Sequence, residues 1–293
     1  MFSAIYFSGG GAITHRAMLS GKYGRFIVND IDGRLPKLFL DCAYGKYTVE
    51  NHPEWISREE FNARKDDDAY IALVWSFGNN GRDYLYGKDI EEMKHAYHKA
   101  VYDDDLESLK AFGYHLIKSD KAGIYDRYLE YQRQVKAQTP SIQLEIVTRQ
   151  TEIERLQSLQ SLQSLQSLQS LQSLQSHGID YSEVPIPKGA LIYCDIPYRG
   201  TICGKYRGFD HDRFYKWAER QDNIFISEYE MPSEFVPFAW IEKQVLSSAD
   251  GNSYWAKEKI FTNKRTYEKL DKFDRERIKC NFATQMNIYD FLR

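Results

Sequence analysis

The sequence lacks any apolar run long enough to cross a membrane, and it carries almost no net charge. A membrane-spanning helix needs about 20 consecutive apolar residues, whereas the mean hydropathy of this chain is -0.60. Lysine and arginine number 39 against 42 aspartates and glutamates, which gives a net charge of -3 over 293 residues. This balance excludes a general nucleic-acid coat protein but not a local basic groove. The start of the chain also lacks the basic and apolar stretches of a secretory signal.

Cysteine is scarce, with four residues in the chain and no Cys-x-x-Cys pair. This pattern argues against a disulfide framework and a cysteine zinc site, and we expect a reduced, cytoplasmic protein that is not attached to a membrane. His95 and His98 lie three residues apart in a helical-looking segment beside Glu91 and Glu92. Such a segment is more typical of a solvated helix face than of a metal site, so we predict no metal ligands.

The N-terminal segment has the pattern strand, glycine turn, helix, strand, acid. Residues 2–7 and 25–28 are short apolar runs, glycines 9–11 follow the first run, and Asp30 follows the second. Glycines allow a ligand close to the backbone, a helix N-terminus favours anionic groups, and an acid about 20 residues later can bind ribose hydroxyls. The pattern therefore predicts half of a nucleotide-binding α/β unit.

The middle of the chain has a different character. Residues 51–141 are more charged and have apolar residues at helical spacing, which predicts a helical insertion. Residues 156–176 repeat Leu-Gln-Ser seven times. A period of three matches neither the α-helix nor the strand, and the leucines of an α-helix would visit every side of it. We therefore expect a spacer of variable length, with a docking or dimerising helix as the alternative.

The α/β pattern resumes at residues 190–194, an apolar strand followed by Asp195-Ile196-Pro197-Tyr198. This order predicts a carboxylate, a main-chain carbonyl and an aromatic ring at the edge where α/β sheets bind ligands. The carboxylate and the Ile196 carbonyl can accept hydrogen bonds from an amino group on a flat ring, and the tyrosine can stack on that ring. A plain strand-to-loop turn is the alternative interpretation.

Together these motifs resemble the Dam-like class of DNA adenine-N6 methyltransferases, of phage or restriction-modification type. The similarity covers most of residues 5–265 in order, and its glycine turn is Phe7-Ser8-Gly9-Gly10-Gly11. Asn29-Asp30-Ile31 matches the family's ribose-binding segment, and Asp180-Tyr181 matches its pair that contacts the cofactor adenine. The resemblance implies an α/β fold in which a Rossmann-like methyltransferase sheet, residues 1–50 and 142–265, carries the helical insertion. The tail, residues 266–293, has no assigned role.

By this resemblance the cofactor is S-adenosylmethionine and the substrate is double-stranded DNA, with the target adenine flipped out of the duplex. The target adenine is assigned to the tetrad Asp195, Ile196, Pro197 and Tyr198. The cofactor is assigned to Phe7, Ser8, Gly9, Gly10, Gly11, Asp30, Ile31, Asp180 and Tyr181. In the insertion, amide, guanidinium and aromatic side chains have suitable chemistry for DNA, namely those of Asn79, Asn80, Arg82, Tyr84 and Tyr86. A cognate restriction nuclease is a candidate partner, and the oligomeric state stays open.

Three departures from the family pattern bear on activity. Ile196 stands where the family usually has proline, but a main-chain carbonyl supplies the hydrogen bond there, so we expect activity to survive. Ile5 stands where an aspartate is common. The family also has a segment with lysine and glycine ahead of the glycine turn, whereas Met1 lies only eight residues before Gly9. We expect Ile5 to weaken cofactor binding. For the missing segment three alternatives stay open: the chain is truncated, another segment substitutes for it, or cofactor affinity is poor.

Other functions stay open from the residues. A degenerate homologue would bind DNA without chemistry, and the same tetrad chemistry accepts cytosine N4 or a glutamine amide. A nicotinamide dehydrogenase is disfavoured by Thr14, which stands at the third glycine position of the dinucleotide fingerprint. A C5-cytosine methyltransferase is excluded, because it needs a nucleophilic cysteine after proline and Tyr198 follows Pro197.

Overall fold

The chain divides into two compact units. The computed structural model describes residues 2–6, 11–140, 150–199, 208–246 and 253–270. Unit 1 contains residues 1–39 and 167–293, and unit 2 contains residues 40–166. Over the described residues the fold is mixed α/β. Unit 2 is longer at both ends than the insertion expected from the sequence, residues 51–141. It begins at residue 40, and at its other end it includes helix α9 (Glu152–Gln160) and part of the repeat.

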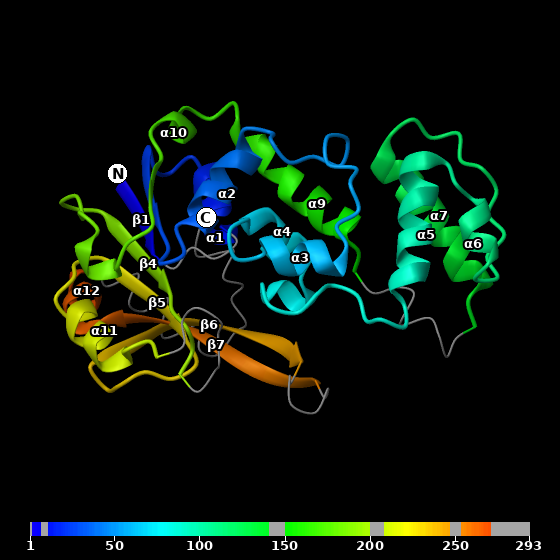
Figure 1. Ribbon diagram of the computed structural model, residues 1–293. Helices are drawn as coiled ribbons and strands as arrows, with labels where there is room; N and C mark the ends of the chain where they lie inside the picture. The colour runs from blue at the N-terminus through cyan, green and yellow to red at the C-terminus, as the bar shows by residue number, and fades with distance from the viewer. Residues whose placement is uncertain (1, 7–10, 141–149, 200–207, 247–252, 271–293) are drawn as a thin grey trace. The chain divides into compact units, whose positions relative to one another are not determined.

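Unit 1 is built on a seven-stranded mixed sheet with the strand order β3-β2-β1-β4-β5-β7-β6 (Figure 1). β1 to β5 run parallel, and β7 runs antiparallel to its neighbours β5 and β6. The strands are β1 (Phe2–Tyr6), β2 (Arg25–Asn29), β3 (Gln175–His177), β4 (Leu191–Asp195), β5 (Ile224–Glu228), β6 (Phe235–Leu246) and β7 (Ser253–Asn263).

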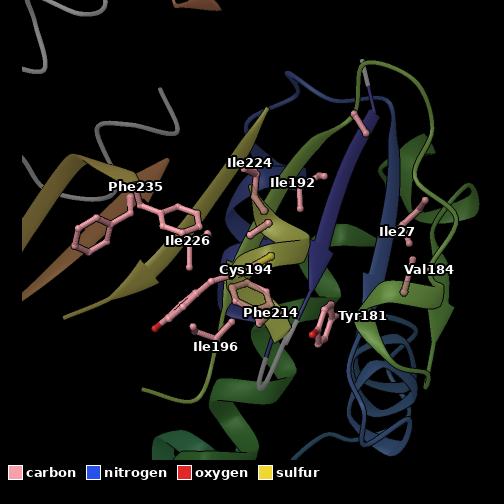
Figure 2. Close-up of a cluster of buried hydrophobic side chains, with 14 residues drawn as sticks. Ile27, Tyr181, Val184, Ile192, Cys194, Ile196, Phe214, Ile224, Ile226 and Phe235 are labelled. Carbon is pink, nitrogen blue, oxygen red and sulfur yellow. The ribbon is translucent and has the colours of Figure 1, made fainter. Parts of the chain in front are cut away.

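Apolar side chains cover the central strands, as expected for parallel strands with buried faces. Every residue of β5 is buried. Ile192 and Cys194 of β4 and Ile226 of β5 belong to one core cluster with Phe214 of α11 (Figure 2). Burying an aliphatic or aromatic side chain of this size contributes roughly 1.5–3 kcal/mol. The helices of this unit are α1 (Ala12–Leu19), the first part of α2 (Arg34–Ala43), α10 (Gln169–Gln172), the 3₁₀-helix η4 (Tyr181–Glu183), α11 (His211–Ala218) and α12 (Lys264–Lys269).

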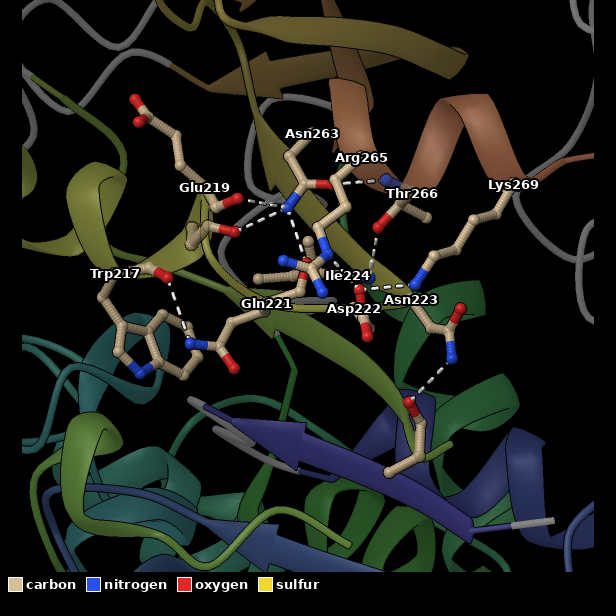
Figure 3. A network of polar contacts seen from close by, with 12 residues as sticks. Trp217, Glu219, Gln221, Asp222, Asn223, Ile224, Asn263, Arg265, Thr266 and Lys269 are labelled. Atoms are coloured by element: carbon tan, nitrogen blue, oxygen red, sulfur yellow. Dashed lines mark hydrogen bonds and ion pairs between the residues drawn. The ribbon is translucent and has the colours of Figure 1, made fainter. Parts of the chain in front are cut away.

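A polar junction joins α11, β7 and α12 (Figure 3). The side-chain amide of buried Asn263 donates to the carbonyls of Ala218, at 2.7 Å, and Gln221, at 2.9 Å. Its Oδ1 accepts a hydrogen bond from the Thr266 amide at 2.7 Å and so caps α12. Because one side chain satisfies groups at the end of one helix and the start of another, the junction holds the end of β7 in register.

Helices dominate the described residues of unit 2, and side chains mark where several of them begin. Ser57 accepts a hydrogen bond from the Glu60 amide, and Asp68 accepts one from the Tyr70 amide. Thr151 and Glu154 form a reciprocal capping box. The helices are α3 (Arg58–Arg64), α4 (Ala69–Val74), η1 (Phe77–Asn79), α5 (Glu91–Asp103), α6 (Glu107–Lys110), α7 (Ile124–Gln138), α9 (Glu152–Gln160) and η3 (Ser161–Leu165).

A buried ion pair lies in unit 2, where the sequence suggested a solvated helix face. His98 is 4% exposed, and its Nδ1 is 2.9 Å from Glu152 Oε1 while its Nε2 is 2.7 Å from the Pro53 carbonyl. Both ring nitrogens lie within hydrogen-bond distance of oxygen atoms, so the ring is held from two sides. Burial raises the pKa of Glu152, but hydrogen bonds from His98 and Tyr86 and the charge of His98 outweigh burial. The pKa of Glu152 therefore lies below its ordinary value.

The Leu-Gln-Ser repeat is part of both units rather than a spacer. It leaves α9 and continues as the 3₁₀-helix η3. A 3₁₀-helix has three residues per turn, which is the period of the repeat, so Leu162 and Leu165 lie on one side and both are buried. The repeat then passes through α10 and supplies Gln175 and Ser176 to β3. The period of three was compared above with the α-helix and the strand, but the 3₁₀-helix is the regular structure that it matches.

Replacing Leu165 with alanine should lower the free energy of unfolding by about 2–5 kcal/mol, because the fully buried side chain would leave a cavity. Leu159 of the same repeat is only partly buried, so Leu159→Ala removes the same atoms as a matched control with a smaller expected loss. Urea unfolding followed by circular dichroism measures both. Equally small losses of stability in the two variants would contradict the burial of Leu165 in η3.

Candidate functional site

Four segments that the sequence marks as functional follow neighbouring strands at one edge of the unit 1 sheet. They come after β3, β2, β1 and β4, whose carboxyl ends share an edge because these strands are parallel. The direction of the strand order reverses between β1 and β4, and α/β sheets bind ligands at such a switch point. The fold thus brings Asp180, Asp30, Gly11 and Asp195 to the same edge of the sheet.

The glycine turn after β1 is described only at its last residue. Phe7, Ser8, Gly9 and Gly10 lie outside the described residues. Gly11 caps α1 with a φ of 77°, in the left-handed region, and a Cβ atom there would collide with the Phe39 ring. Both facts require glycine at this position.

The segment after β2 combines a buried acid with an exposed aliphatic residue. Asp30 is fully buried, and one of its carboxylate oxygens accepts a hydrogen bond from the Asp32 amide at 3.0 Å. Ile31 is 49% exposed. The Asn29 side chain exchanges hydrogen bonds of 3.0 and 3.2 Å with the backbone of Ile179, which ties the ends of β2 and β3 together. Ile31 is therefore the accessible member of this segment for contact with a flat ligand.

The Asp180-Tyr181 pair after β3 has divided roles. Asp180 caps η4 and forms a two-pronged ion pair with Arg213, with distances of 2.9 and 3.1 Å. Burial raises its pKa, but hydrogen bonds from Ser182 and Arg213 outweigh burial, so the pKa of Asp180 is lowered and the carboxylate is ionised near neutral pH.

Tyr181 differs from its expected role as an open contact for the cofactor adenine. Its side chain belongs to the core cluster (Figure 2). The ring centroid lies 5.0 Å from that of Trp217, and the Arg213 guanidinium lies 5.3 Å from the Tyr181 centroid. The ring is only 6% exposed, because η4 packs it against α11. A cofactor contact through Tyr181 thus requires movement of Arg213 or contact at the ring edge.

The tetrad after β4 combines an exposed, a buried and two half-buried side chains. Asp195 is exposed, whereas Ile196 is buried in the core cluster, where the family usually has proline (Figure 2). The Pro197 carbonyl accepts a hydrogen bond from His211 Nε2 at 2.8 Å, and the Arg199 amide donates to Glu228 at 3.1 Å. The loop is thus held from the start of α11 and the end of β5, which compensates for the rigidity that proline would supply.

The Tyr198 hydroxyl lies among three acceptors from β4, β5 and β7. It is 2.5 Å from Glu258 Oε1, 3.2 Å from Ser227 Oγ and 3.4 Å from Asp195 Oδ1. The Ser227 hydroxyl donates to the same Glu258 oxygen at 2.7 Å. Burial raises the pKa of Tyr198, and the charge of Asp195 and the hydrogen bond to Glu258 raise it further. The phenol therefore stays protonated and acts as a donor.

The sequence analysis did not identify the residues that hold the tetrad. Ser227 and Glu228 lie in β5, a strand of the type found in the family that the sequence resembles, but neither residue was assigned a role of its own. Glu258 stands two residues before Ile260 in β7, so both lie on the same face of the strand. A lone acid on the buried face of a strand was the one available signal.

The segment of residues 75–87 in unit 2 forms a tight hairpin-like turn. Its arms are joined by a bridge between Ser76 and Tyr84 and by a hydrogen bond of 2.8 Å from the Leu85 amide to the Trp75 carbonyl. Asn79, with a φ of 56°, lies in the left-handed region together with two flanking glycines. The exposed side chains at its tip are those of Phe77, Asn79, Asn80, Arg82 and Asp83. Arg82 forms an ion pair of 2.9 Å with Asp83.

Two of the residues assigned to DNA contact have buried side chains, so their rings are not presented to solvent. Tyr84 and Tyr86 are 7% and 2% exposed. The Tyr84 hydroxyl donates to the Ile56 carbonyl at 2.6 Å, and the Tyr86 hydroxyl donates to Glu152. Both belong to the core of unit 2. Phe77, 56% exposed, is the aromatic residue that this turn presents to solvent, and the sequence analysis did not select it.

Over the described residues, no cluster of three or more His, Cys, Asp or Glu side chains has the geometry of a metal site. Within the same ranges, every helix is too short or too polar to cross a membrane. No family model matches the sequence, and the search of curated proteins gives no match.

Proposed function

We propose that the chain is a site-specific DNA methyltransferase that transfers a methyl group from S-adenosylmethionine to N6 of a flipped-out adenine. The observation that carries the proposal is the position of the tetrad. Asp195 ends β4, which pairs with β1, and the glycine turn follows β1. The two motifs that the sequence assigns to target and cofactor thus lie at adjacent strand ends at the switch point of the sheet.

The arrangement of the sheet supports the same proposal. Its parallel strands follow the order 3-2-1-4-5 of a doubly wound nucleotide-binding sheet. The antiparallel β7 lies between β5 and β6 and extends this parallel sheet. A Rossmann-like methyltransferase sheet is therefore the finer description that we propose for unit 1.

The tetrad residues suit an exocyclic amino group. The exposed Asp195 carboxylate accepts a hydrogen bond from N6. The Ile196 carbonyl accepts the second N–H, and the Tyr198 ring stacks on the base. These contacts draw the nitrogen lone pair toward the methyl donor. An adenine inside the duplex cannot reach these groups, so the base must leave the stack.

Residues at the same edge fit the cofactor in part. Exposed Ile31 offers an apolar surface to the cofactor adenine, and ionised Asp180 offers an acceptor to its amino group. When bound, S-adenosylmethionine supplies the methyl group. Asp30 is in the expected position for the ribose, but its burial means that the neighbouring loop must open to admit a hydroxyl.

The turn of residues 75–87 is proposed to contact DNA through its exposed tip. We expect Phe77→Ala and Arg82→Ala each to weaken DNA binding by about tenfold, because wedge and base-edge contacts contribute roughly 1–3 kcal/mol. Lys88→Ala removes an exposed side chain just beyond the turn and is the matched control. Fluorescence anisotropy with duplex DNA at fixed salt measures all three. Unchanged affinity in both tip variants would contradict a role for this turn.

The proposed function is tested by incubating the purified full chain with S-adenosylmethionine labelled in its methyl group and with unmethylated plasmid DNA. Label that stays on the DNA after the free cofactor has been removed supports the proposal. Label that stays with the free cofactor, at enzyme concentrations where the cofactor binds, contradicts it.

A further inference from the structure

A buried carboxylate stands behind the tyrosine of the tetrad. Glu258, on β7, is 8% exposed, and Ser227, on the neighbouring strand β5, is fully buried. Glu258 Oε1 accepts the hydroxyls of both Tyr198, at 2.5 Å, and Ser227, at 2.7 Å. Two donors on one oxygen are the pattern of an ionised carboxylate.

This arrangement is more than a tyrosine needs for stacking. The hydroxyl group of a phenol has one hydrogen to donate, and among the Tyr198 contacts described above the one to Glu258 is the shortest. Placing a carboxylate in a buried position is unfavourable unless its hydrogen bonds offset the lost hydration. A tyrosine that only covered a base would be equally well served by an apolar neighbour. The position of Glu258 therefore calls for a role that depends on its charge.

We propose that Glu258, oriented by Ser227, is a positioning residue that fixes Tyr198 and makes its ring more electron-rich toward the target adenine. The inference deepens the proposed function and rests on it. During methyl transfer the N6 lone pair forms the bond to the methyl carbon, and the electrons of the sulfur–carbon bond stay on sulfur. The adenine then carries one positive charge until N6 releases a proton to solvent past Asp195.

The contribution of Glu258 grows as that charge develops. A cation over an aromatic face is attracted by the ring, and a carboxylate hydrogen-bonded to the phenol strengthens the negative potential of the ring. The neutral adenine of the ground state gains little from this potential. An interaction that is stronger in the transition state raises kcat and leaves KM nearly unchanged.

The test is Glu258→Gln in the full chain, with steady-state kcat and KM measured on unmethylated plasmid DNA. The glutamine keeps the shape and an acceptor for Tyr198 but removes the charge. We expect kcat to fall about tenfold with KM within about twofold, from the size of cation–π interactions. Glu230→Gln is the matched control, because Glu230 is an exposed carboxylate that pairs with Lys259 on the same strand as Glu258; it should leave both parameters unchanged.

Two further variants separate a positioning role from simple destabilisation. Tyr198→Phe removes the same hydrogen bond from the other end and should lower kcat by a similar factor. Adding Glu258→Gln to Tyr198→Phe should then cause no further fall. An unchanged kcat in Glu258→Gln, or equal losses in both backgrounds, overturns this inference while the wild-type protein still methylates DNA. A wild-type protein that transfers no methyl group overturns the proposed function and this inference together.

Discussion

Replacing Asp195 with alanine is expected to slow methyl transfer to DNA at least about 1000-fold, which is the scale of removing a group that stabilises charge at the reacting atom. Asp195 is the exposed carboxylate at the end of β4, and it is the one tetrad side chain proposed to hold N6 directly. Cofactor affinity should change little, because the cofactor is assigned to segments after β1, β2 and β3. Single-turnover kinetics and calorimetric cofactor titration measure the two effects separately.

Two variants make the comparison specific. Asp195→Asn keeps an oxygen acceptor and should lose less activity than alanine. Asp212→Ala removes an exposed carboxylate that pairs with Arg199, the residue that follows the tetrad in the chain. This variant should stay near wild-type activity. Normal methylation by Asp195→Ala would refute the assignment of the tetrad.

The second large effect concerns stability rather than catalysis. Glu152→Gln should lower the free energy of unfolding by about 3 kcal/mol at pH 7, because it removes the buried carboxylate that pairs with His98 and accepts a hydrogen bond from Tyr86. Glu60→Gln, in an exposed pair with Arg64, should change stability by less than about 1 kcal/mol. Denaturant unfolding followed by tryptophan fluorescence measures both.

The pH dependence of this effect has a definite sign. The pKa of Glu152 in the folded chain is lowered below 4.5, its ordinary value. The stability that its charge contributes is therefore present above that value and is lost as the pH falls through the folded pKa. The difference between wild type and Glu152→Gln should shrink as the pH is lowered below about 4.5. A difference that grows on acidification would contradict the ionised state of the pair.

The order of strands and turns in unit 1 follows from local sequence patterns. The apolar run before Asp195 and the run before Asp30 could be recognised because parallel strands are short, apolar and bounded by turns. The lengths of β6 and β7 could not be recognised from the sequence, because their outer parts form a two-stranded ribbon with mixed polar and apolar residues. Antiparallel pairing of that kind gives a weaker sequence signal than burial on both faces.

Side-chain burial was the harder part of the site to anticipate. The sequence placed Asp180 and Tyr181 together, but only the packing of η4 against α11 shows that the tyrosine ring belongs to the core. In the same way, Tyr84 and Phe77 are both aromatic residues of one turn, yet the first is buried and the second exposed. Which ring faces inward depends on the partners of the turn, such as the Ile56 carbonyl, and these are distant in sequence.

The Leu-Gln-Ser repeat adopts a structure that its comparison with the α-helix and the strand did not include. With a period of three, successive leucines move around an α-helix and alternate between the two faces of a strand. In a 3₁₀-helix, which has three residues per turn, they stay on one side. Leu162 and Leu165 use that match to stay on one side of η3. Since 3₁₀-helices rarely exceed a few residues, the repeat leaves this conformation after Leu165 and continues in other forms.

The central claim is methylation of adenine at N6, and the most direct measurement is the identity of the methylated base. The purified chain is incubated with S-adenosylmethionine and unmethylated DNA, the DNA is digested to nucleosides, and the products are identified by mass spectrometry. The account predicts N6-methyladenine from the wild-type protein and none from Asp195→Ala. Methylated cytosine alone, or no methylated base at all, would contradict it.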